Sequence, residues 1–331
     1  MQKMRWFYRA ATSINLFLLC SGASVIAHAT CPGALADRRF DFDGDGKTDL
    51  AVFRQSTGQW FVILSSTGGT DNSVWGNPGE NDIPVPGDYD GDCKIDTAYW
   101  NPATGIWNIK PSSGGSPISR QWGASSLGDI PVTGDYDGDG KTDLAVFRQS
   151  TGQWFVILSS TGGTDNSVWG NAGENDIPVP GDYDGDGKTD TAYWNPSTGT
   201  WNIKLSSTGA TVSRQWGSSS LGDIPVSGDF DGDGKTDLAV FRQSTGQWFV
   251  ILSSTGGTDN SVWGNAGEND IPVPGDYDGD GKTDTAYWNP VTGTWNIKLS
   301  STGATVSRQW GSSADVDIPV PTPAGYITSH F

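Results

Sequence analysis

Several residue types on which catalytic sites depend are scarce in this sequence. Histidine occurs twice and cysteine three times in 331 residues. The histidines, His28 and His330, stand near the two ends, which excludes a Ser-His-Asp triad or a histidine-based zinc site from the body of the chain. The only glutamates, Glu80, Glu174 and Glu268, occupy equivalent polar stretches that suit a solvated loop better than a glycosidase pair. The sequence therefore predicts a protein that is not an enzyme.

Basic residues are also in short supply. The 20 lysines and arginines are outnumbered by 38 aspartates and glutamates, which gives a formal net charge of −18. This excess argues against nucleic acid as a partner and against binding to an anionic membrane surface. Strong acidity can indicate disorder, but 16 Trp, 12 Phe and 9 Tyr do not fit a disordered chain.

Long apolar runs are missing outside the N-terminus. There, basic residues precede an apolar stretch over residues 14–26, and Ala27-His28-Ala29 has the small-x-small pattern of a cleavage site. We therefore expect residues 1–29 to be a cleaved signal peptide, and the protein to be secreted or on the cell surface without membrane insertion.

Of the cysteines that remain, Cys31 and Cys93 are possible disulfide partners, although sequence cannot show whether they approach closely enough.

What the sequence has instead is an internal repeat. The pattern Asp-aromatic-Asp-Gly-Asp recurs every 47 residues, and two versions alternate. Residues 41–87 and 229–275 differ only by Pro78 against Ala266. The six repeats begin at Asp41, Asp88, Asp135, Asp182, Asp229 and Asp276.

Each repeat reads as four short strands. In the first repeat they are residues 50–53, 60–64, 73–75 and 82–85, separated by polar, glycine-containing turns. Four strands in 40–50 residues is typical of one propeller blade. We therefore predict an all-β fold, a six-bladed β-propeller.

The ends of the repeat array indicate how the ring closes. The Asp-Ile-Pro-Val strand precedes every acidic loop except the first, and a last copy at residues 317–320 has no loop after it. Docking of this C-terminal strand beside the first loop would close the circle and remove the open sheet edge. The predicted organisation is a lead-in over residues 30–40, a propeller over residues 41–321 and a tail over residues 322–331.

The acidic loop has the chemistry of a calcium site. Numbered from its first aspartate, it places carboxylates at positions 1, 3, 5 and 9, and a glycine at position 6 lets the position-7 carbonyl turn inward. A turn that binds nothing would leave four carboxylates repelling one another, and magnesium demands a tighter octahedral shell. We expect about six Ca²⁺ ions. The predicted ligands are Asp41, Asp43, Asp45, Lys47, Asp49, Asp88, Asp90, Asp92, Lys94, Asp96, Asp135, Asp137, Asp139, Lys141, Asp143, Asp182, Asp184, Asp186, Lys188, Asp190, Asp229, Asp231, Asp233, Lys235, Asp237, Asp276, Asp278, Asp280, Lys282 and Asp284.

These loops, set between a Gly-Asp strand end and a Leu-Ala-Val-Phe strand, resemble the FG-GAP/VCBS repeat family, which includes the propellers of integrin α-subunits. The resemblance covers residues 41–321 and implies a Ca²⁺-binding propeller on an extracellular protein. It carries over only to the aspartates at positions 1, 3, 5 and 9. The family is most often seven-bladed, whereas six repeats are counted here. The second loop also departs, because Cys93 replaces the position-6 glycine and would be strained at positive φ.

Tryptophan-asparagine pairs give a second functional hypothesis. They recur every 94 residues, and an aromatic face beside an amide can stack on and hydrogen-bond a sugar; the alternative is packing between blades. The pairs are Trp100-Asn101, Trp194-Asn195 and Trp288-Asn289.

Our first hypothesis is a secreted, calcium-binding adhesion or structural module for an extracellular protein or glycan. The alternatives are a lectin-like propeller with three equivalent pockets and, third, a polysaccharide hydrolase or lyase.

Overall fold

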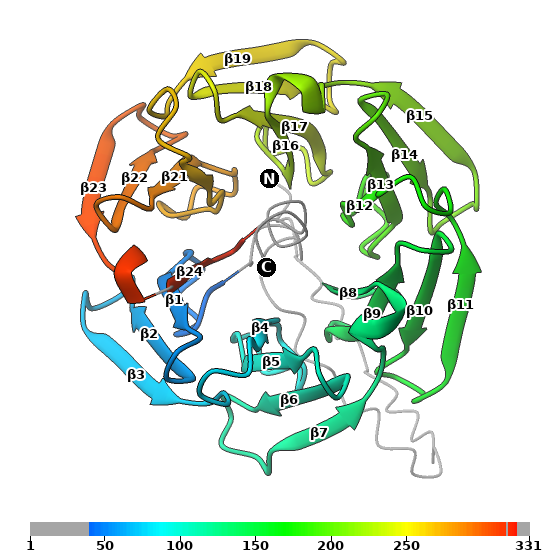
Figure 1. The fold of residues 1–331 in the computed structure, drawn as a ribbon. Coiled ribbons are helices and arrows are strands. Elements are labelled where there is room, and N and C mark those ends of the chain that lie inside the picture. Colours follow the sequence, from blue (N-terminus) through cyan, green and yellow to red (C-terminus); the bar gives the residue numbers. More distant parts are fainter. Residues whose placement is uncertain (1–39, 316, 323–331) are drawn as a thin grey trace, which may run out of the picture.

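The computed structural model describes residues 40–315 and 317–322 (Figure 1). The predicted signal peptide, the lead-in up to residue 39 and the tail from residue 323 lie outside the described residues. Within the described part, strands β1 to β24 form six four-stranded antiparallel sheets arranged as blades around a central channel (Figure 1). The predicted all-β, six-bladed β-propeller is confirmed.

The strands of each blade follow one another outward from the channel. Blade 1 consists of β24 (Asp317–Val320), β1 (Leu50–Arg54), β2 (Gln59–Ile63) and β3 (Thr70–Val74). Blade 2 consists of β4 (Ile83–Pro84), β5 (Thr97–Asn101), β6 (Ile106–Lys110) and β7 (Ile118–Gln121). Blade 3 consists of β8 (Asp129–Gly134), β9 (Asp143–Arg148), β10 (Gln153–Ile157) and β11 (Thr164–Val168).

The other three blades repeat this order. Blade 4 consists of β12 (Ile177–Pro178), β13 (Thr191–Asn195), β14 (Thr200–Lys204) and β15 (Thr211–Gln215). Blade 5 consists of β16 (Asp223–Gly228), β17 (Asp237–Arg242), β18 (Gln247–Ile251) and β19 (Thr258–Val262). Blade 6 consists of β20 (Ile271–Pro272), β21 (Thr285–Asn289), β22 (Thr294–Lys298) and β23 (Thr305–Gln309). Three short 3₁₀ turns, η1 (Ser125–Leu127), η2 (Ser219–Leu221) and η3 (Ser313–Asp315), precede the inner strands of blades 3, 5 and 1.

The strand boundaries predicted for the first repeat agree with the structure to within one residue, except at the start of its third strand. The outermost strand of blade 1 starts at Thr70, three residues before the predicted start at Ser73. The added residues are polar and exposed. Apolar patterning does not mark them because this strand has a neighbour on one side only and lies at the solvent-facing rim.

The ring closes as the sequence predicts. Strand β24 pairs antiparallel with β1, with Ala51 opposite Val320 and Arg54 opposite Asp317. The Arg54 guanidinium donates two hydrogen bonds to the buried Asp317 carboxylate, at 2.7 and 2.9 Å, and lies over the ring of Phe61. The same bidentate pair joins the inner and second strands of blades 3 and 5, so blade 1 is complete even though its strands come from both ends of the array.

Tryptophans fasten each blade to the next. Nine are fully buried within the blades, where they supply the bulky apolar filling that a narrow sheet needs. Six others follow an outermost strand, and each donates its indole N–H across to a backbone carbonyl of the next blade. These bonds, 3.0–3.3 Å long, run from Trp75 to Asn108, Trp122 to Phe155, Trp169 to Asn202, Trp216 to Phe249, Trp263 to Asn296 and Trp310 to Phe61.

The tyrosines at the second position of the acidic loops show how strictly the blades repeat. Tyr89 donates its hydroxyl to the carbonyl of Val85, at 2.6 Å, whereas the buried hydroxyl of Tyr136 has no partner among the described residues. The equivalent residues of blades 1 and 5 are phenylalanines. We expect Tyr136→Phe to stabilise the fold by about 1 kcal/mol and Tyr89→Phe to destabilise it by a similar amount. Denaturant unfolding of both variants checks this, and equal destabilisation would show that the Tyr136 hydroxyl is paired.

Candidate metal centres

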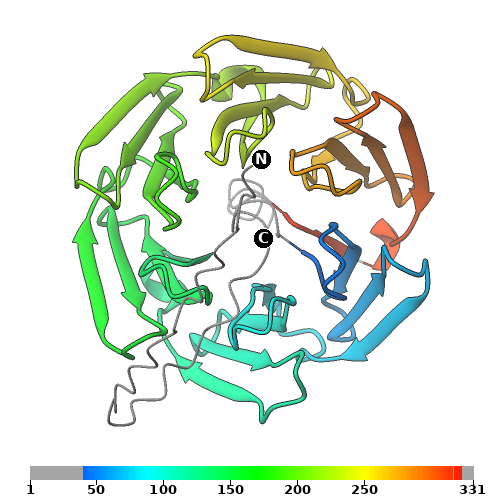
Figure 2. The same ribbon diagram turned by 180° about the vertical axis from the view of Figure 1, so that it is seen from behind.

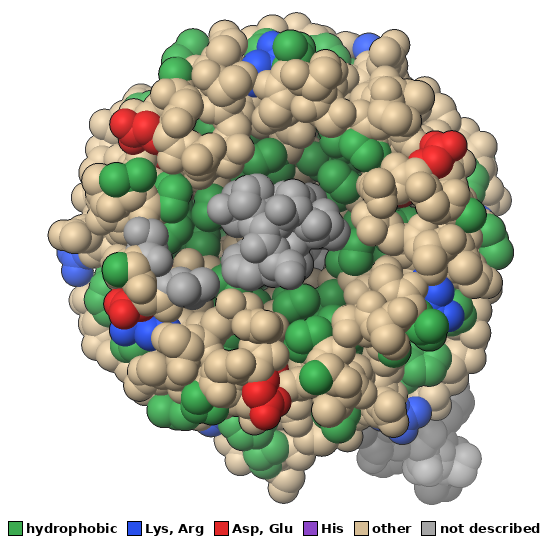
Figure 3. Space-filling model, viewed as in Figure 1, with side chains coloured by type: hydrophobic (Ala, Val, Ile, Leu, Met, Phe, Trp, Pro, Cys, Tyr) green, Lys and Arg blue, Asp and Glu red, His purple; other side chains and the backbone are tan. Residues whose placement is uncertain are grey.

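The acidic segments are named loops 1 to 6 and begin at Asp41, Asp88, Asp135, Asp182, Asp229 and Asp276. Each leads into the second strand of its blade, at the end where the turn between the third strand and the outermost strand also lies. The loops therefore gather on one face around the channel, which Figure 2 shows from the side opposite to Figure 1. On the face shown in Figure 3, hydrophobic side chains surround the central opening and acidic groups are few.

Hydrogen bonds within each loop hold the first and last carboxylates in place. In loop 1, Asp41 accepts the backbone N–H groups of Gly44 at 2.6 Å and Gly46 at 2.8 Å. Asp49, at position 9, accepts the N–H groups of Phe42 at 2.8 Å and Ser65 at 2.6 Å. Both aspartates are buried. The loop thus curls around its own carboxylates, as an Asp-Gly-rich cation loop does.

A serine pair in the neighbouring turn supports the two remaining carboxylates. Ser65 donates its hydroxyl to Asp45 at 2.8 Å, and Ser66 donates to Asp43 at 2.6 Å. Sequence reasoning missed these residues because it treated them as part of a polar turn. The signal was present, since a Ser-Ser pair stands 24 residues after the first aspartate of every repeat.

The lysines at position 7 have a defined place in each loop. Their backbone N–H groups donate to the position-5 carboxylate at 2.9–3.0 Å, which tightens the turn. Coordination of a cation by their carbonyls stays a prediction. The lysines are Lys47, Lys94, Lys141, Lys188, Lys235 and Lys282.

The carboxylates converge closely enough to share one ion. In loops 1 to 5, ligand oxygens of three aspartates lie within 4.8 Å of one another. The converging groups are Asp41, Asp43 and Asp45; Asp88, Asp90 and Asp96; Asp135, Asp137 and Asp143; Asp182, Asp184 and Asp190; and Asp229, Asp231 and Asp237.

Two position-3 carboxylates carry the clearest sign of a missing partner. The Oδ1 atoms of Asp231 and Asp278 are buried and accept no hydrogen bond within the described residues. A buried carboxylate oxygen without a partner is costly to leave desolvated. In loops 1 to 4 the equivalent oxygen accepts the backbone N–H at position 5, at 3.2–3.3 Å, and in loops 5 and 6 a cation held among the surrounding carboxylates would fill the same role.

Burial and mutual repulsion disturb the titration of these groups. Desolvation raises the pKa of the position-9 carboxyl to about 6 in five loops, and the neighbouring position-3 aspartate adds to the rise. The residues are Asp49, Asp96, Asp190, Asp237 and Asp284. Burial likewise raises the pKa of Asp135, at position 1 of loop 3, to about 6. Such shifts mean that the negative charges are held together against their preference unless a cation offsets them.

Loop 2 keeps the same geometry despite its substitution. Cys93 adopts φ = 71°, the left-handed conformation that glycine has at this position in the other loops. Its backbone N–H still donates to Asp88, at 2.9 Å. Cys93 is disulfide-bonded, and its predicted partner Cys31 lies outside the described residues.

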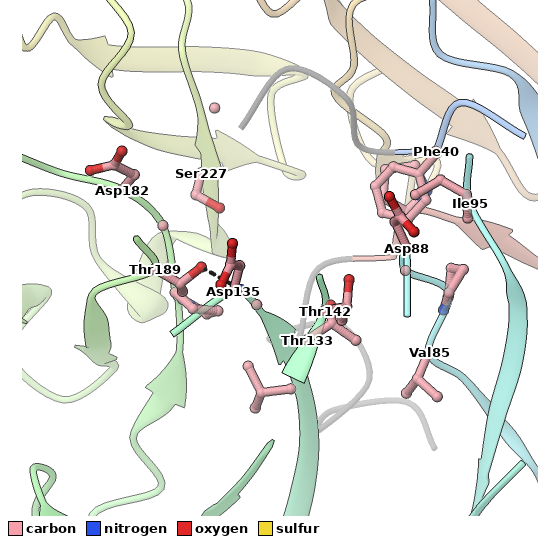
Figure 4. Close-up of a pocket in the computed structure, with 18 of the residues that line it drawn as sticks. Phe40, Val85, Asp88, Ile95, Thr133, Asp135, Thr142, Asp182, Thr189 and Ser227 are labelled. Atoms are coloured by element: carbon pink, nitrogen blue, oxygen red, sulfur yellow. Dashed lines mark hydrogen bonds between the residues drawn. The ribbon is translucent and has the colours of Figure 1, made fainter. Parts of the chain in front are cut away.

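Neighbouring loops are linked into a closed ring by hydrogen bonds. The N–H at position 8 of each loop donates to the carbonyl at position 1 of the preceding loop, at 2.6–2.9 Å, and Thr48 closes the ring onto Asp276. In addition, the Thr189 hydroxyl accepts the N–H of Asp135 at 2.9 Å, beside the channel (Figure 4). The other donors and acceptors are Ile95 to Asp41, Thr142 to Asp88, Thr189 to Asp135, Thr236 to Asp182 and Thr283 to Asp229. One backbone hydrogen bond thus joins the residue that carries the first carboxylate of one loop to the residue just before the last carboxylate of the next loop.

The predicted sugar pockets take the packing alternative instead. Trp100 is 1% exposed and donates its indole N–H to the carbonyl of Trp122. Asn101 is 2% exposed, and its amide donates to Glu80 at 2.7 Å and to Asp82 at 2.8 Å. The same contacts hold for Trp194, Asn195 and Glu174, and for Trp288, Asn289 and Glu268. These side chains offer no open aromatic face, and the glutamates brace the connection between blades.

Comparison with known proteins places the ring among established folds. The model of the FG-GAP repeat matches residues 127–166 and 221–260, two equivalent segments that each run through an acidic loop. No curated protein matches the sequence. A solved lectin of Agrocybe aegerita that recognises non-reducing terminal N-acetylglucosamine is similar over 87% of this chain and 85% of its own, at 14% identity and a TM-score of 0.56. A streptogramin B lyase is similar over 85% of both chains, at 10% identity and a TM-score of 0.54.

At such low identities the similarity concerns the fold alone, and this fold serves both binding and catalysis. The sequence match is narrower and more specific, because it falls on the acidic loops and their flanking strands. The chain is a six-bladed β-propeller in which two segments match the FG-GAP repeat.

Proposed function

We propose that this protein is an exported β-propeller that binds calcium in its six acidic loops and acts as a non-catalytic binding or structural module. The observation that carries the proposal is the convergence of carboxylates in the loops, with buried, unpartnered oxygens at Asp231 and Asp278. Calcium accepts six to eight oxygens at flexible geometry, which suits carboxylates already fixed by backbone N–H groups.

Support for a non-catalytic role comes from the repetition itself. The loops, the serine pairs and the bracing glutamates recur around the ring, and the described residues contain no histidine. An active site built from such parts would have to occur in several equivalent copies. The proposed signal peptide at residues 1–29 would deliver the protein to calcium-rich surroundings. Among the described residues, no helix is long and apolar enough to cross a bilayer.

Metal analysis combined with calorimetric titration tests the proposal. The wild-type protein is expected to bind about six Ca²⁺ ions, and Asp231→Ala about one fewer. Asp259→Ala is the matched control, because this residue lies in the same blade but is exposed on the outermost strand β19. Absence of bound calcium in the wild type, or equal loss in both variants, would refute the assignment of the loops.

The ring of hydrogen bonds leads us to expect cooperative binding. Fixing position 1 of one loop orients the carbonyl that receives the N–H beside position 9 of the next. The titration curve should therefore be steeper than that of independent sites. Terbium luminescence sensitised by the tryptophans can follow it, and a curve for six independent sites would show that the loops bind separately.

Binding is also expected to depend on pH. Since the pKa of the position-9 carboxyls is raised to about 6, protons compete with calcium below that value, and affinity should fall as pH falls from 7 to 5. The chelated protein should show the opposite trend in stability. Its folded state holds these protons more tightly than the unfolded chain, so this contribution is present below about pH 4 and is lost as pH rises through 6. Thermal unfolding across this range, with and without chelator, distinguishes the two trends.

A further inference from the structure

The outer rim of the propeller consists of six strands with a free edge. Strands β3, β7, β11, β15, β19 and β23 each pair with one neighbour and end their sheet. Their residues are almost all exposed, including Val74, Val168 and Val262 at 64–67%. Natural edge strands are commonly protected by lysine, proline or a bulge. These strands contain neither lysine nor proline.

The charge of this rim alternates from blade to blade. The odd blades carry the sequence Thr-Asp-Asn-Ser-Val, with one acidic side chain, and the even blades end in Ser-Arg-Gln, with one basic side chain. All six are exposed, and none makes an ion pair or hydrogen bond within the part of the chain that the structure describes. The acidic residues are Asp71, Asp165 and Asp259, and the basic residues are Arg120, Arg214 and Arg308.

The two kinds of edge are complementary when they are laid side by side. If β3 of one molecule is aligned antiparallel with β15 of another over their full length, Asp71 stands opposite Arg214 and Asn72 opposite Ser213. Opposite charges in directly opposed positions stabilise a strand pair. Two acidic edges aligned in the same way place Asp71 opposite a serine and add two like charges to the contact, so the mixed pair is favoured.

We propose that the rim is a self-association surface, on which an acidic edge of one copy pairs by β-sheet addition with a basic edge of a second copy. The main-chain groups of the free edges supply hydrogen bonds, and the aspartate-arginine pairs select the partner and the register. Because the contact joins two different edges, it does not close on itself, and each copy offers three edges of each kind for further neighbours.

The antiparallel register also limits the repulsion between these acidic molecules. Outermost strands of one propeller all run in the same sense along its axis, so antiparallel pairing turns adjacent copies upside down relative to each other. The faces that carry the acidic loops then point to opposite sides of the assembly. Individual contacts of five residues are small, and growth through several edges provides the avidity that one contact lacks.

Charge reversal tests this inference with two triple variants. The first carries Asp71→Arg, Asp165→Arg and Asp259→Arg, and the second carries Arg120→Asp, Arg214→Asp and Arg308→Asp. In sedimentation velocity at low salt, the wild type should associate with rising concentration, and each variant alone should associate at least about ten-fold more weakly. An equimolar mixture of the two variants should recover association, because one supplies only basic edges and the other only acidic edges.

Each possible result of this experiment either supports or overturns the proposed self-association. A wild type that stays monomeric up to about millimolar concentration, or variants that associate as well as the wild type, would overturn the proposal. Association of the single variants but not of the mixture would do the same. All six positions are exposed, and an unchanged midpoint of thermal unfolding would show that the variants are folded. Calcium binding at the loops is measured separately, so its failure would not be confused with failure of the rim contact.

Discussion

Removal of calcium by a chelator is expected to lower the midpoint of thermal unfolding by on the order of 10–20 °C. Extracellular calcium sites bind at about 0.1–1 mM, and at a few times that concentration each ion contributes on the order of 1 kcal/mol. Six such contributions are comparable with the whole stability of a typical domain. The effect is large because the loops join inner strands to second strands and also touch one another around the channel.

The measurement is a thermal melt of the purified protein in excess calcium, in EDTA and after calcium is restored. Restored calcium should return the midpoint to its original value, whereas magnesium should return little of it, since it keeps its waters and demands a tighter shell. An unchanged midpoint in EDTA, together with metal-free protein before treatment, would contradict calcium binding by the loops.

Most of the architecture could be predicted because it is encoded within one repeat. The acidic loop, the turn at Gly58 and the apolar run ending at Phe53 recur at a fixed interval, and a unit of four strands cannot bury itself alone. Even the closing strand was predictable, since Asp317 to Val320 repeats an element that otherwise always precedes a loop.

Contacts between elements could not be read in the same way. Ser65 and Ser66 reach carboxylates 20 and 23 residues earlier in the chain, and no local periodicity indicates such a contact. The choice between a sugar-binding and a packing role for Asn101 was left open by the sequence for the same reason. Beside Trp100 it resembles a sugar-binding pair in sequence, whereas in the fold it is buried against Glu80 and Asp82 at the junction of two blades.

The repeats also supply built-in controls for the contribution of ring closure to stability. Arg54, Arg148 and Arg242 each make a bidentate contact with an aspartate, and each lies over the equivalent phenylalanine of its own blade. Only the first of these pairs joins strands from opposite ends of the repeat array. Arg54 also forms an ion pair with the exposed Asp315 at 3.2 Å, which the other two arginines lack among the described residues. A difference between equivalent variants therefore measures the contribution of ring closure once this second pair has been removed as well.

Deletion of residues 317–331 is expected to abolish the compact monomer. The truncated chain loses β24, and with it the buried Ile318 and Val320 and the partner of Arg54. Burial of two such side chains contributes roughly 3–6 kcal/mol, and loss of the hydrogen bonds from the Arg54 guanidinium, which keeps its ion pair with Asp315, costs about 1.5–3 kcal/mol more. Their sum is comparable with the stability of a typical domain. Size-exclusion chromatography and far-UV circular dichroism should show an unfolded or aggregated chain, whereas a chain that ends at Thr322 keeps β24 and should stay folded.

A single substitution at the closing strand pair should also lower the stability of the fold, although by less than the deletion of β24. Asp317→Ala and Asp223→Ala remove the same contact to an arginine, at 2.7 and 2.6 Å respectively. Strand β16 stays covalently connected to β17 through loop 5, so Asp223→Ala removes one contact without opening the ring. Strand β24 is tied to β1 only by pairing, so the ring can open there, and the exposed edge of β1 can recruit β24 of another molecule. The Asp317→Ala variant should therefore unfold at a lower denaturant concentration than Asp223→Ala, and it should form domain-swapped oligomers. If both variants unfold at the same midpoint and stay monomeric, closure of the ring does not depend on this pair.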